Sequence, residues 1–497
     1  MLLVPLLLLA AAPLTPRFTD PARRVKLEQA FPKLDRIFED FQRYRRAPGL
    51  VYGVVIDGEL AHVKALGVRS RASGEPVTPE TLFRIASMTK SFTALAILKL
   101  RDEGRLSLED PVSKWIPELA RWSYPTRDTA PIRVRQLLTH EAGFPEDNPW
   151  GDRQLGISSA VLSEWLRAGI PFSTPPGTEY EYSNYGFALL GRIVERASKV
   201  TYREYLEKRI LAPLGMKDST LEPAAAPERL RATGYSLKEG QYVEEPALPH
   251  GAFGAMGGLL TNARDLARYV AFQLSAWPPR EEEDRGPVKR SSLREMQQLR
   301  RLSSFTAAPP RVAGYGYGLV VSRNARFAHL VGHGGGLPGF GSYMLWLPEC
   351  GVGVFAMANI TYAAPLQAAM EALEALQDTG GLSPRKLPPS PALLATQERI
   401  VRLWERWDDQ AAAEMAADNL FLDESADSRR RGIEKLKATV GRCRPQGELE
   451  PENLLRGRFR LDCENGAVTV AFTLAPTMPP KVQYLRFDPA PAGKTAP

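Results

Sequence analysis

The segment RIASMTKSFTALAILKL (residues 84–100) places a lysine three positions after a serine at the start of an almost wholly apolar helix. From residue 92 to residue 100 the apolar run is broken only at positions 93 and 99, so this helix has almost no polar face and should be buried. Residues three apart share one face of a helix, so Ser87 and Lys90 can touch. A lysine that only solvates a surface belongs on a polar face, and this lysine needs another explanation.

Ser87 and Lys90 have the properties of a nucleophile beside its base. At the start of a helix, Ser87 directs free backbone N–H groups and the positive end of the helix dipole at whatever is bound to its oxygen. Burial disfavours the charged form of Lys90 and lowers its pKa toward that of a useful base. The S-x-x-K pattern alone is weak, because it recurs at Ser383 and Lys386 in a Pro-rich segment where it carries no function. The alternative for Ser87 is a plain helix N-cap.

Length and charge limit the classes of protein that the chain can belong to. A chain of 497 residues exceeds one ordinary core and predicts two or three domains. Its net charge of +7 is modest and its basic residues are scattered, with Arg429–Arg431 as the longest basic run. We therefore expect no nucleic-acid partner, and the charge merely permits contact with an anionic cell envelope.

The N-terminal residues MLLVPLLLLAAAPLTPR (1–17) have the pattern of a secretory signal peptide. Their apolar block is shorter than the roughly 20 residues that span a bilayer, and Ala10 and Ala12 supply an A-x-A cleavage pattern. No Lys or Arg precedes the block and Pro13 follows the cut, so a misassigned start codon is the alternative. We expect a periplasmic or secreted protein with no stable membrane insertion after signal cleavage.

The order of the expected elements predicts an α/β (α+β) fold for residues 18–380. Strand patterns lie near both ends of this region and helical patterns fill its middle, from about 105 to 300. This order predicts one antiparallel sheet flanked by helices, closed by chain ends that meet, with a helical subdomain inserted into it. The expected elements are a helix over 18–44, a hairpin over 50–68, the Ser87 helix ending near residue 104, strands over 327–333, 341–348 and 351–360, and a helix over 365–377.

A separate small α+β domain is expected over residues 393–497, after a Pro-rich linker over 381–392. Its patterns predict helices over 393–416 and 429–440 and strands over 454–461, 467–474 and 482–487. This order faintly resembles cystatin-like or nuclear-transport-factor-like cones. The domain could cap the active site, bind a ligand or mediate assembly.

The three cysteines show no zinc-binding or C-x-x-C spacing. In an exported protein Cys443 and Cys463 could pair, which would leave Cys350 as a buried thiol.

Two further motifs accompany the Ser87 helix. The segment YEYSNYGFALLG supplies Tyr182 and Asn184 in a Y-x-N pattern. The segment VGHGGGLPGFGSY supplies His333 at the end of a strand, followed by glycines that would let a substrate backbone approach closely.

The ordered set S-x-x-K, Y-x-N and H-x-G resembles the serine β-lactamase and penicillin-binding-protein superfamily. The branch it resembles is that of class C β-lactamases, D-Ala-D-Ala carboxypeptidases, D-aminopeptidases and related esterases. The resemblance covers about residues 35–378 and implies the fold expected above. Further similar stretches are LFRIASMTK, RVRQLLTHEAGFP, PGTEYEYSNYGFALLGRIVE, LAPLGMKDSTL and GAMGGLLTNARDLARY.

The resemblance implies a role for each residue of the first two motifs. Ser87 would be the acylated nucleophile and Lys90 its proton acceptor. Tyr182 would carry a proton to the leaving group and activate the deacylating water, and Asn184 would hold the substrate amide. The alternative for Tyr182 is a core tyrosine with a satisfied hydroxyl.

The third motif departs from many relatives, which carry Lys where this chain has His333. The resemblance implies a catalytic or binding role for His333, with Gly334 and Gly335 following it, and an oxyanion hole made by the backbone N–H groups of Ser87 and Gly336. A structural histidine at the end of a strand is the alternative. No metal and no other cofactor is implied.

We therefore expect an exported serine hydrolase that forms a Ser87 acyl-enzyme with small amides, D-residue peptides or esters and has weak or no β-lactamase activity. Its partner would be a small-molecule or short-peptide substrate, including one derived from peptidoglycan. The alternatives are a non-catalytic penicillin-binding or peptidoglycan-sensing protein and a true class C-like β-lactamase. In a further alternative the C-terminal domain carries the function. His140 is expected to be a structural hydrogen-bonding residue, because HEAGF lacks the second histidine of a metalloprotease helix.

Overall fold

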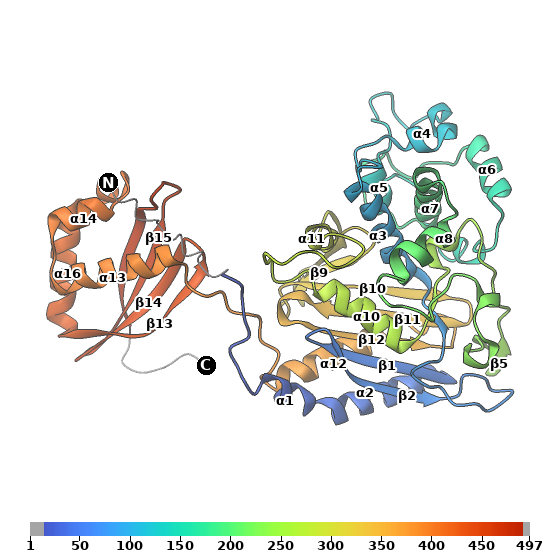
Figure 1. The fold of residues 1–497 in the computed structure, drawn as a ribbon, viewed down its shortest axis with the longest axis horizontal. Helices are drawn as coiled ribbons and strands as arrows, with labels where there is room; N and C mark the ends of the chain where they lie inside the picture. The colour runs from blue at the N-terminus through green and yellow to red at the C-terminus, as the bar shows by residue number, and fades with distance from the viewer. Residues whose placement is uncertain (1–13, 491–497) are drawn as a thin grey trace, which may run out of the picture. The chain divides into compact units, whose positions relative to one another are not determined.

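The computed structural model describes residues 14–490 and divides the chain into two compact units (Figure 1). The first unit is Asp20–Pro384, and the second joins the residues up to Thr19 to the chain from Arg385 onward. The boundary therefore falls within residues 381–392, where the sequence predicts a linker. Most of the expected signal peptide (1–17) lies outside the described residues.

The first unit contains an eight-stranded sheet in which all strand pairs are antiparallel, as the sequence predicts. The strand β1, near the start of the unit, pairs with β12, near its end, in the register Leu50↔Ala358 to Ile56↔Val352. Segments from the two ends of the unit therefore close the sheet. In spatial order the strands are β2 (Glu59–Gly67), β1 (Gly49–Ile56), β12 (Val352–Ala358), β11 (Phe340–Leu347), β10 (Leu330–Leu337), β9 (Val320–Asn324), β8 (Arg311–Tyr315) and β7 (Arg301–Thr306).

Three of these strands, β7 to β9, were not predicted. The outermost, β7, has the sequence RLSSFT and is almost wholly exposed, so it lacks the alternation of buried and exposed residues that reveals a strand. Strand β10 also extends further than predicted, because the glycines after His333 continue it as far as Leu337.

Helices cover both faces of the sheet (Figure 1), and strand β1 shows how the sequence builds both interfaces. Leu50, Tyr52 and Val54 pack with the core beneath α2 (Phe31–Arg45) and α12 (Leu366–Asp378). Val51 and Val55, on the opposite face, join the core shared with α10 (Ala263–Leu274). A strand places alternate residues on opposite faces, so a continuous apolar run can fill two cores.

The N-terminal helix predicted over residues 18–44 is instead two helices, α1 (Arg23–Glu28) and α2. The helical part lies between β2 and β7 and contains two short antiparallel strand pairs, the first between distant segments and the second a hairpin. These are β3 (Phe83–Arg84) with β6 (Leu260–Thr261), and β4 (Tyr235–Lys238) with β5 (Gln241–Glu244). Its helices, besides α10, are α3 (Thr89–Asp102), α4 (Val112–Trp115), α5 (Val134–Leu138), α6 (Ser159–Ala168), α7 (Asn184–Ser198), α8 (Tyr202–Leu206), α9 (Gly254–Gly257) and α11 (Arg290–Met296).

The second unit packs helices on a four-stranded antiparallel sheet, one strand more than predicted. The unpredicted strand, CRPQGELEPEN, is rich in charge and proline and shows no apolar alternation. The helix predicted over 393–416 is broken between α13 and α14. The elements are α13 (Pro391–Glu405), α14 (Asp409–Met415), α15 (Leu420–Asp423), α16 (Ala426–Val440), β13 (Cys443–Asn453), β14 (Arg456–Cys463), β15 (Gly466–Leu474) and β16 (Val482–Ala490).

The cysteines pair as expected, but Cys350 is less buried than expected. Cys443 and Cys463 lie opposite each other on β13 and β14 and form a disulfide. Cys350, in the first unit, is half-buried and not buried as expected, because it follows the strand β11 in a turn at the surface. Across residues 14–490, every helix is too short or too polar to cross a bilayer.

Candidate active site

Ser87 lies in a tight 3-10 turn, Ala86–Met88, that leads directly into α3. Ala86 has a φ of 49°, a left-handed conformation that is uncommon for a residue with a side chain. The neighbouring strands hold the turn in place. The Ser342 hydroxyl on β11 donates to the Ile85 carbonyl over 2.9 Å. On β10, a Cβ at Gly335 would lie 2.0 Å from the same oxygen, so only glycine permits this approach.

The Lys90 side-chain nitrogen is fully buried and contacts three oxygen atoms. Nζ lies 3.0 Å from Ser87 Oγ, 2.6 Å from Asn184 Oδ1 and 2.9 Å from the Met256 carbonyl oxygen. The last two oxygens can only accept hydrogen bonds. The two N–H groups of a neutral amine therefore point to them, and its lone pair is left facing the Ser87 hydroxyl.

Burial lowers the pKa of Lys90 to about 7, opposed in part by the negative charges of Asp152 and Asp147. The same burial raises the pKa of each of those two carboxyl groups. Lys90 is thus neutral in a large fraction of molecules at neutral pH, where an ordinary lysine is charged. The site contains an amine able to accept the Ser87 proton.

Tyr182 lies two residues before α7 and lines the same pocket as Ser87. Burial raises the pKa of Tyr182 well above its ordinary value of 10, so its hydroxyl keeps its proton. His140, expected to be structural, packs against the Tyr182 ring with centroids 4.3 Å apart and accepts the Ser183 N–H through Nδ1 over 3.1 Å. The Lys90 nitrogen lies 4.9 Å from the centre of the Tyr182 ring.

Asn184 was expected to hold the substrate amide, and the structure engages it elsewhere. Its side chain is fully buried, with Oδ1 accepting from Lys90 and Nδ2 donating to Asn148 Oδ1 over 2.6 Å. Lys90 has N–H groups to donate in either charge state, so we assign the Asn184 amide with Oδ1 toward Lys90, and the Asn148 NH₂ group then remains able to donate to a ligand. Asn148 lines the pocket above Ser87, whereas Asn184 orients the lysine.

His333 is buried in β10 and both of its ring nitrogens are engaged. Nδ1 lies 2.5 Å from the Gly334 carbonyl oxygen, which can only accept, so Nδ1 carries the proton. Nε2 therefore accepts from the Tyr315 hydroxyl over 2.6 Å. Burial, with repulsion from Lys90, lowers the pKa of His333 to about 3. His333 is a neutral residue that lies beside the site and supplies no positive charge to it.

The glycines after His333 are required by the protein's own packing. A Cβ at Gly334 would lie 2.9 Å from the Tyr343 ring, and one at Gly336 would lie 2.5 Å from the Tyr362 ring. Gly334 and Gly336 line the pocket at Ser87. From the sequence we expected these glycines to let a substrate approach. In the structure they make room for neighbouring side chains and for the Ser87 turn.

The pocket at Ser87 has a volume of about 410 Å³. Four of its residues were not singled out from the sequence, namely Asn148, Pro149, Asp152 and Tyr362. The first three belong to a loop, EDNPWGD, that has no recognisable spacing, and the fourth follows β12. The lining residues are Ser87, Asn148, Pro149, Asp152, Tyr182, Gly334, Gly336 and Tyr362.

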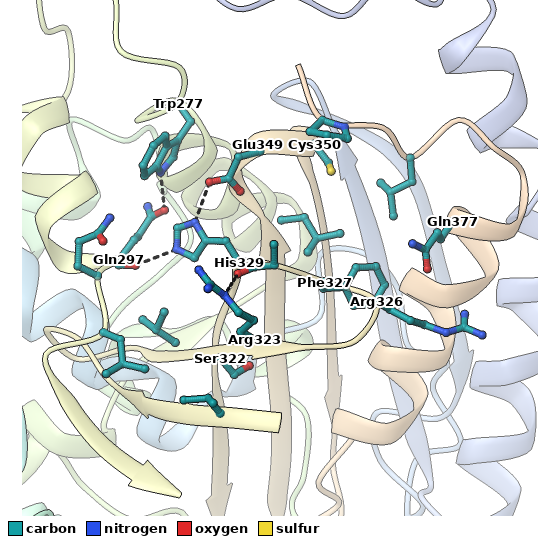
Figure 2. Close-up of a pocket in the computed structure, with 18 residues that line it drawn as sticks. Trp277, Gln297, Ser322, Arg323, Arg326, Phe327, His329, Glu349, Cys350 and Gln377 are labelled. Carbon is teal, nitrogen blue, oxygen red and sulfur yellow. Dashed lines mark hydrogen bonds and ion pairs between the residues drawn. The ribbon is translucent and has the colours of Figure 1, made fainter. Parts of the chain in front are cut away.

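A larger pocket, of about 720 Å³, lies elsewhere in the first unit (Figure 2). At its centre His329 donates through Nδ1 to Glu349 and through Nε2 to the Gln297 carbonyl, each over 2.9 Å. The Glu349 hydrogen bond helps to raise the pKa of His329, against the effect of burial. Arg323 and Arg326 are the other positively charged side chains of this pocket. We assign the chemistry to the smaller pocket at Ser87, where a serine hydroxyl lies 3.0 Å from a buried amine.

An antiparallel sheet with an inserted helical part, and a serine whose hydroxyl faces a buried amine, define the class of serine β-lactamases and penicillin-binding proteins. The sequence comparisons agree. A family model described as Beta-lactamase matches residues 34–379, and the chain belongs to this family. The expected family and fold are confirmed.

Relatives of the chain are found in bacteria, a eukaryote and an archaeon. It is similar to "Protein flp" of Staphylococcus aureus strain MW2, with 31% identity over 334 residues, which are 66% of this chain and 63% of that protein. It is also similar to "Beta-lactamase-like protein 2" of Dictyostelium discoideum, with 30% identity over 51% of this chain and 47% of that protein. The match thus spans less than two thirds of either relative.

Among solved structures, the chain resembles an octameric penicillin-binding protein homologue from Pyrococcus abyssi. The TM-score is 0.60 and the identity 26%, covering 90% of this chain and 96% of that one.

Proposed function

We propose that the protein is a serine hydrolase that forms an acyl-enzyme at Ser87. The observation that carries this proposal is the contact between Ser87 Oγ and the fully buried Lys90 Nζ over 3.0 Å. A catalytic base works best when its pKa lies near the working pH, and the pKa of Lys90 is lowered to about 7. If Ser87 were only a helix N-cap, it would not need a buried amine of lowered pKa beside its hydroxyl.

The geometry supports one assignment of the proton transfers. Lys90 takes the proton of Ser87 as its oxygen attacks the substrate carbonyl carbon. The backbone N–H groups of Ser87 and Gly336 stabilise the oxyanion. Tyr182 keeps its own proton at neutral pH. We assign it the donation of this proton to the leaving group, with the proton that Lys90 took from Ser87 replacing it. The same groups, in reverse order, activate water to release the acyl group.

The pocket favours substrates without a carboxylate beside the scissile bond. His333 is uncharged and turned toward Tyr315 and the Gly334 carbonyl, so it offers no ionic anchor. A charged hydrogen bond is worth roughly 1.5–3 kcal/mol, and its loss predicts weak β-lactam turnover. We therefore propose small esters, amides and D-residue peptides, including peptidoglycan-derived ones, as substrates.

We also propose that the protein acts outside the cytoplasm, in the periplasm or after secretion. The disulfide Cys443–Cys463 supports this location, because structural disulfides persist in oxidising compartments. The apolar N-terminal residues, with the pattern of a signal peptide, support it as well.

The proposal is tested by intact-mass analysis after incubation with a fluorophosphonate and, separately, with a penicillin. We expect one phosphonate adduct, located on Ser87 by peptide mapping and absent from Ser87→Ala. Labelling elsewhere, or none in folded protein, would refute the hydrolase. A penicillin adduct that persists without ester hydrolysis would instead support a non-catalytic penicillin-binding protein. Rapid penicillin hydrolysis with esters untouched would support a true β-lactamase.

A further inference from the structure

We infer that Asp152 is a specificity-determining residue that selects substrates with a protonated amine next to the scissile carbonyl. This inference rests on the proposed function and deepens it, because it names the substrate class: aminoacyl esters and amides with a free amino group. The inference follows from the position of the Asp152 carboxylate, from the charges around it and from the donors that share its pocket.

Asp152 is held rigidly at the wall of the Ser87 pocket. It lies in the short turn Gly151–Arg153, and a Cβ added at Gly151 would lie 2.9 Å from the Asn184 Cβ, so this turn packs directly on the residue that orients Lys90. Asp152 Oδ2 accepts from the Tyr362 hydroxyl over 2.8 Å. The residue is 3% exposed yet lines the pocket together with Ser87. A buried carboxylate in this position needs a partner of opposite charge.

The charged groups of the protein around the pocket do not supply this partner, so we assign that role to a cation on the substrate. Of the eight residues that line the pocket, Asp152 alone has a charged type of side chain. Lys90 attracts it, but the Lys90 nitrogen makes its hydrogen bonds to other atoms and its pKa is lowered to about 7. Asp147 and Glu146 add negative charge to the surroundings of Asp152. The neighbouring Arg153 lies largely in solvent, 3.5 Å from Glu245.

An ammonium group on the substrate would therefore gain from this field, and a carboxylate would be repelled by it. Binding of a cation also offsets the desolvation that raises the pKa of Asp152. The Asn148 NH₂ group on the same wall can donate to a carbonyl oxygen of the substrate. A pocket of about 410 Å³ suits a small acyl group of this kind.

The inference is tested with two nearly isosteric esters, D-alanine methyl ester and methyl D-lactate, in which a hydroxyl replaces the amine. Both are assayed in a pH-stat at pH 7 with wild type, Asp152→Asn and Glu146→Gln, and the pair is repeated in the L series. We expect wild type to prefer the amino ester in kcat/KM by tenfold or more in at least one series. Asp152→Asn should reduce that ratio at least tenfold, and any effect on Lys90 that is common to both esters cancels in the ratio.

Glu146→Gln is the matched control, since it removes the same charge from an exposed residue that does not line the pocket. We expect its preference for the amino ester in kcat/KM to stay within twofold of wild type. An equal loss of this preference in both variants would overturn a direct contact between Asp152 and the substrate amine. If Asp152→Asn does not fold, Tyr362→Phe replaces it; this variant releases the carboxylate and should lower the ratio severalfold.

The outcomes separate this inference from the proposed function. Phosphonate labelling of Ser87 and lactate ester hydrolysis without an amine preference would overturn the inference alone. The same holds if Ser87 is labelled but the amino ester is not hydrolysed. Absence of both labelling and hydrolysis would overturn the proposed function, and the inference with it.

Discussion

The buried amine of Lys90 should make the stability of the protein depend on pH in a way that its replacement by methionine removes. Burial lowers the pKa of Lys90 in the folded protein to about 7, whereas the side chain in the unfolded chain has its ordinary value of 10.5. Between these values the unfolded state binds more protons than the folded state. The free energy of unfolding of wild type must therefore rise with pH across this window, relative to Lys90→Met.

The magnitude follows from the size of the shift. One pKa unit corresponds to about 1.4 kcal/mol, and the folded amine is still half protonated at pH 7, so the relative gain between pH 7 and pH 9 should be roughly 2.3 kcal/mol. Lys90→Met also loses the hydrogen bonds to Asn184 Oδ1 and the Met256 carbonyl. Each loss lowers the free energy of unfolding of the variant by about 1–3 kcal/mol at every pH. They contribute little to the slope, because both acceptors are uncharged throughout.

The assay is equilibrium urea unfolding of wild type and Lys90→Met at pH 6, 7, 8 and 9, with phosphonate labelling of Ser87 measured on the same samples. We expect the difference in free energy to be nearly constant below pH 7 and to grow in favour of wild type above it. Labelling of wild type should rise through pH 7, and Lys90→Met should be slower by about 10² to 10⁴. Parallel stability curves across this range, or labelling of the variant within a few-fold of wild type, would refute the buried, neutral base.

Three further predictions follow from other parts of the structure. His333→Lys should raise kcat/KM for a penicillin relative to a neutral methyl ester, because it introduces a cation beside the pocket; an unchanged ratio would contradict the role of charge there. Gly335→Ala should lower the free energy of unfolding by about 2 kcal/mol or more, since its Cβ would lie 2.0 Å from the Ile85 carbonyl oxygen. The control Gly432→Ala, in the helix α16 with open space around it, should be neutral or stabilising by up to about 1 kcal/mol in urea unfolding. A protease site placed within residues 381–392 should, once cut, release two folded pieces with ester hydrolysis in the N-terminal one; loss of activity and unfolding of both pieces would show that the units depend on each other.

The local features of the fold were predictable wherever a segment buries a regular pattern. The apolar run after Lys90 could only be a buried helix, and strand β1 carries an apolar sequence between two turn signals. Strand β7 escaped prediction because it is almost wholly exposed, its leucine and phenylalanine included, and β13 because its sequence is rich in charge and proline. Neither sequence alternates apolar and polar residues. Their place in a sheet is set by pairing with neighbouring strands.

The sequence by itself determined the pairing of Ser87 with Lys90, because residues three apart meet on one helical face whatever surrounds them. It also determined that this helix is buried, and with the further motifs it determined the family. Only the tertiary structure decided the charges in the site. A pKa depends on burial and on groups brought close from distant parts of the chain, and no spacing in the sequence places Asp152 at the Ser87 pocket or turns His333 toward Tyr315. The nucleophile could therefore be read from the sequence, whereas the charge that the pocket presents to a substrate arises from the packing of the loop 146–152 and strand β10 against the helix that carries it.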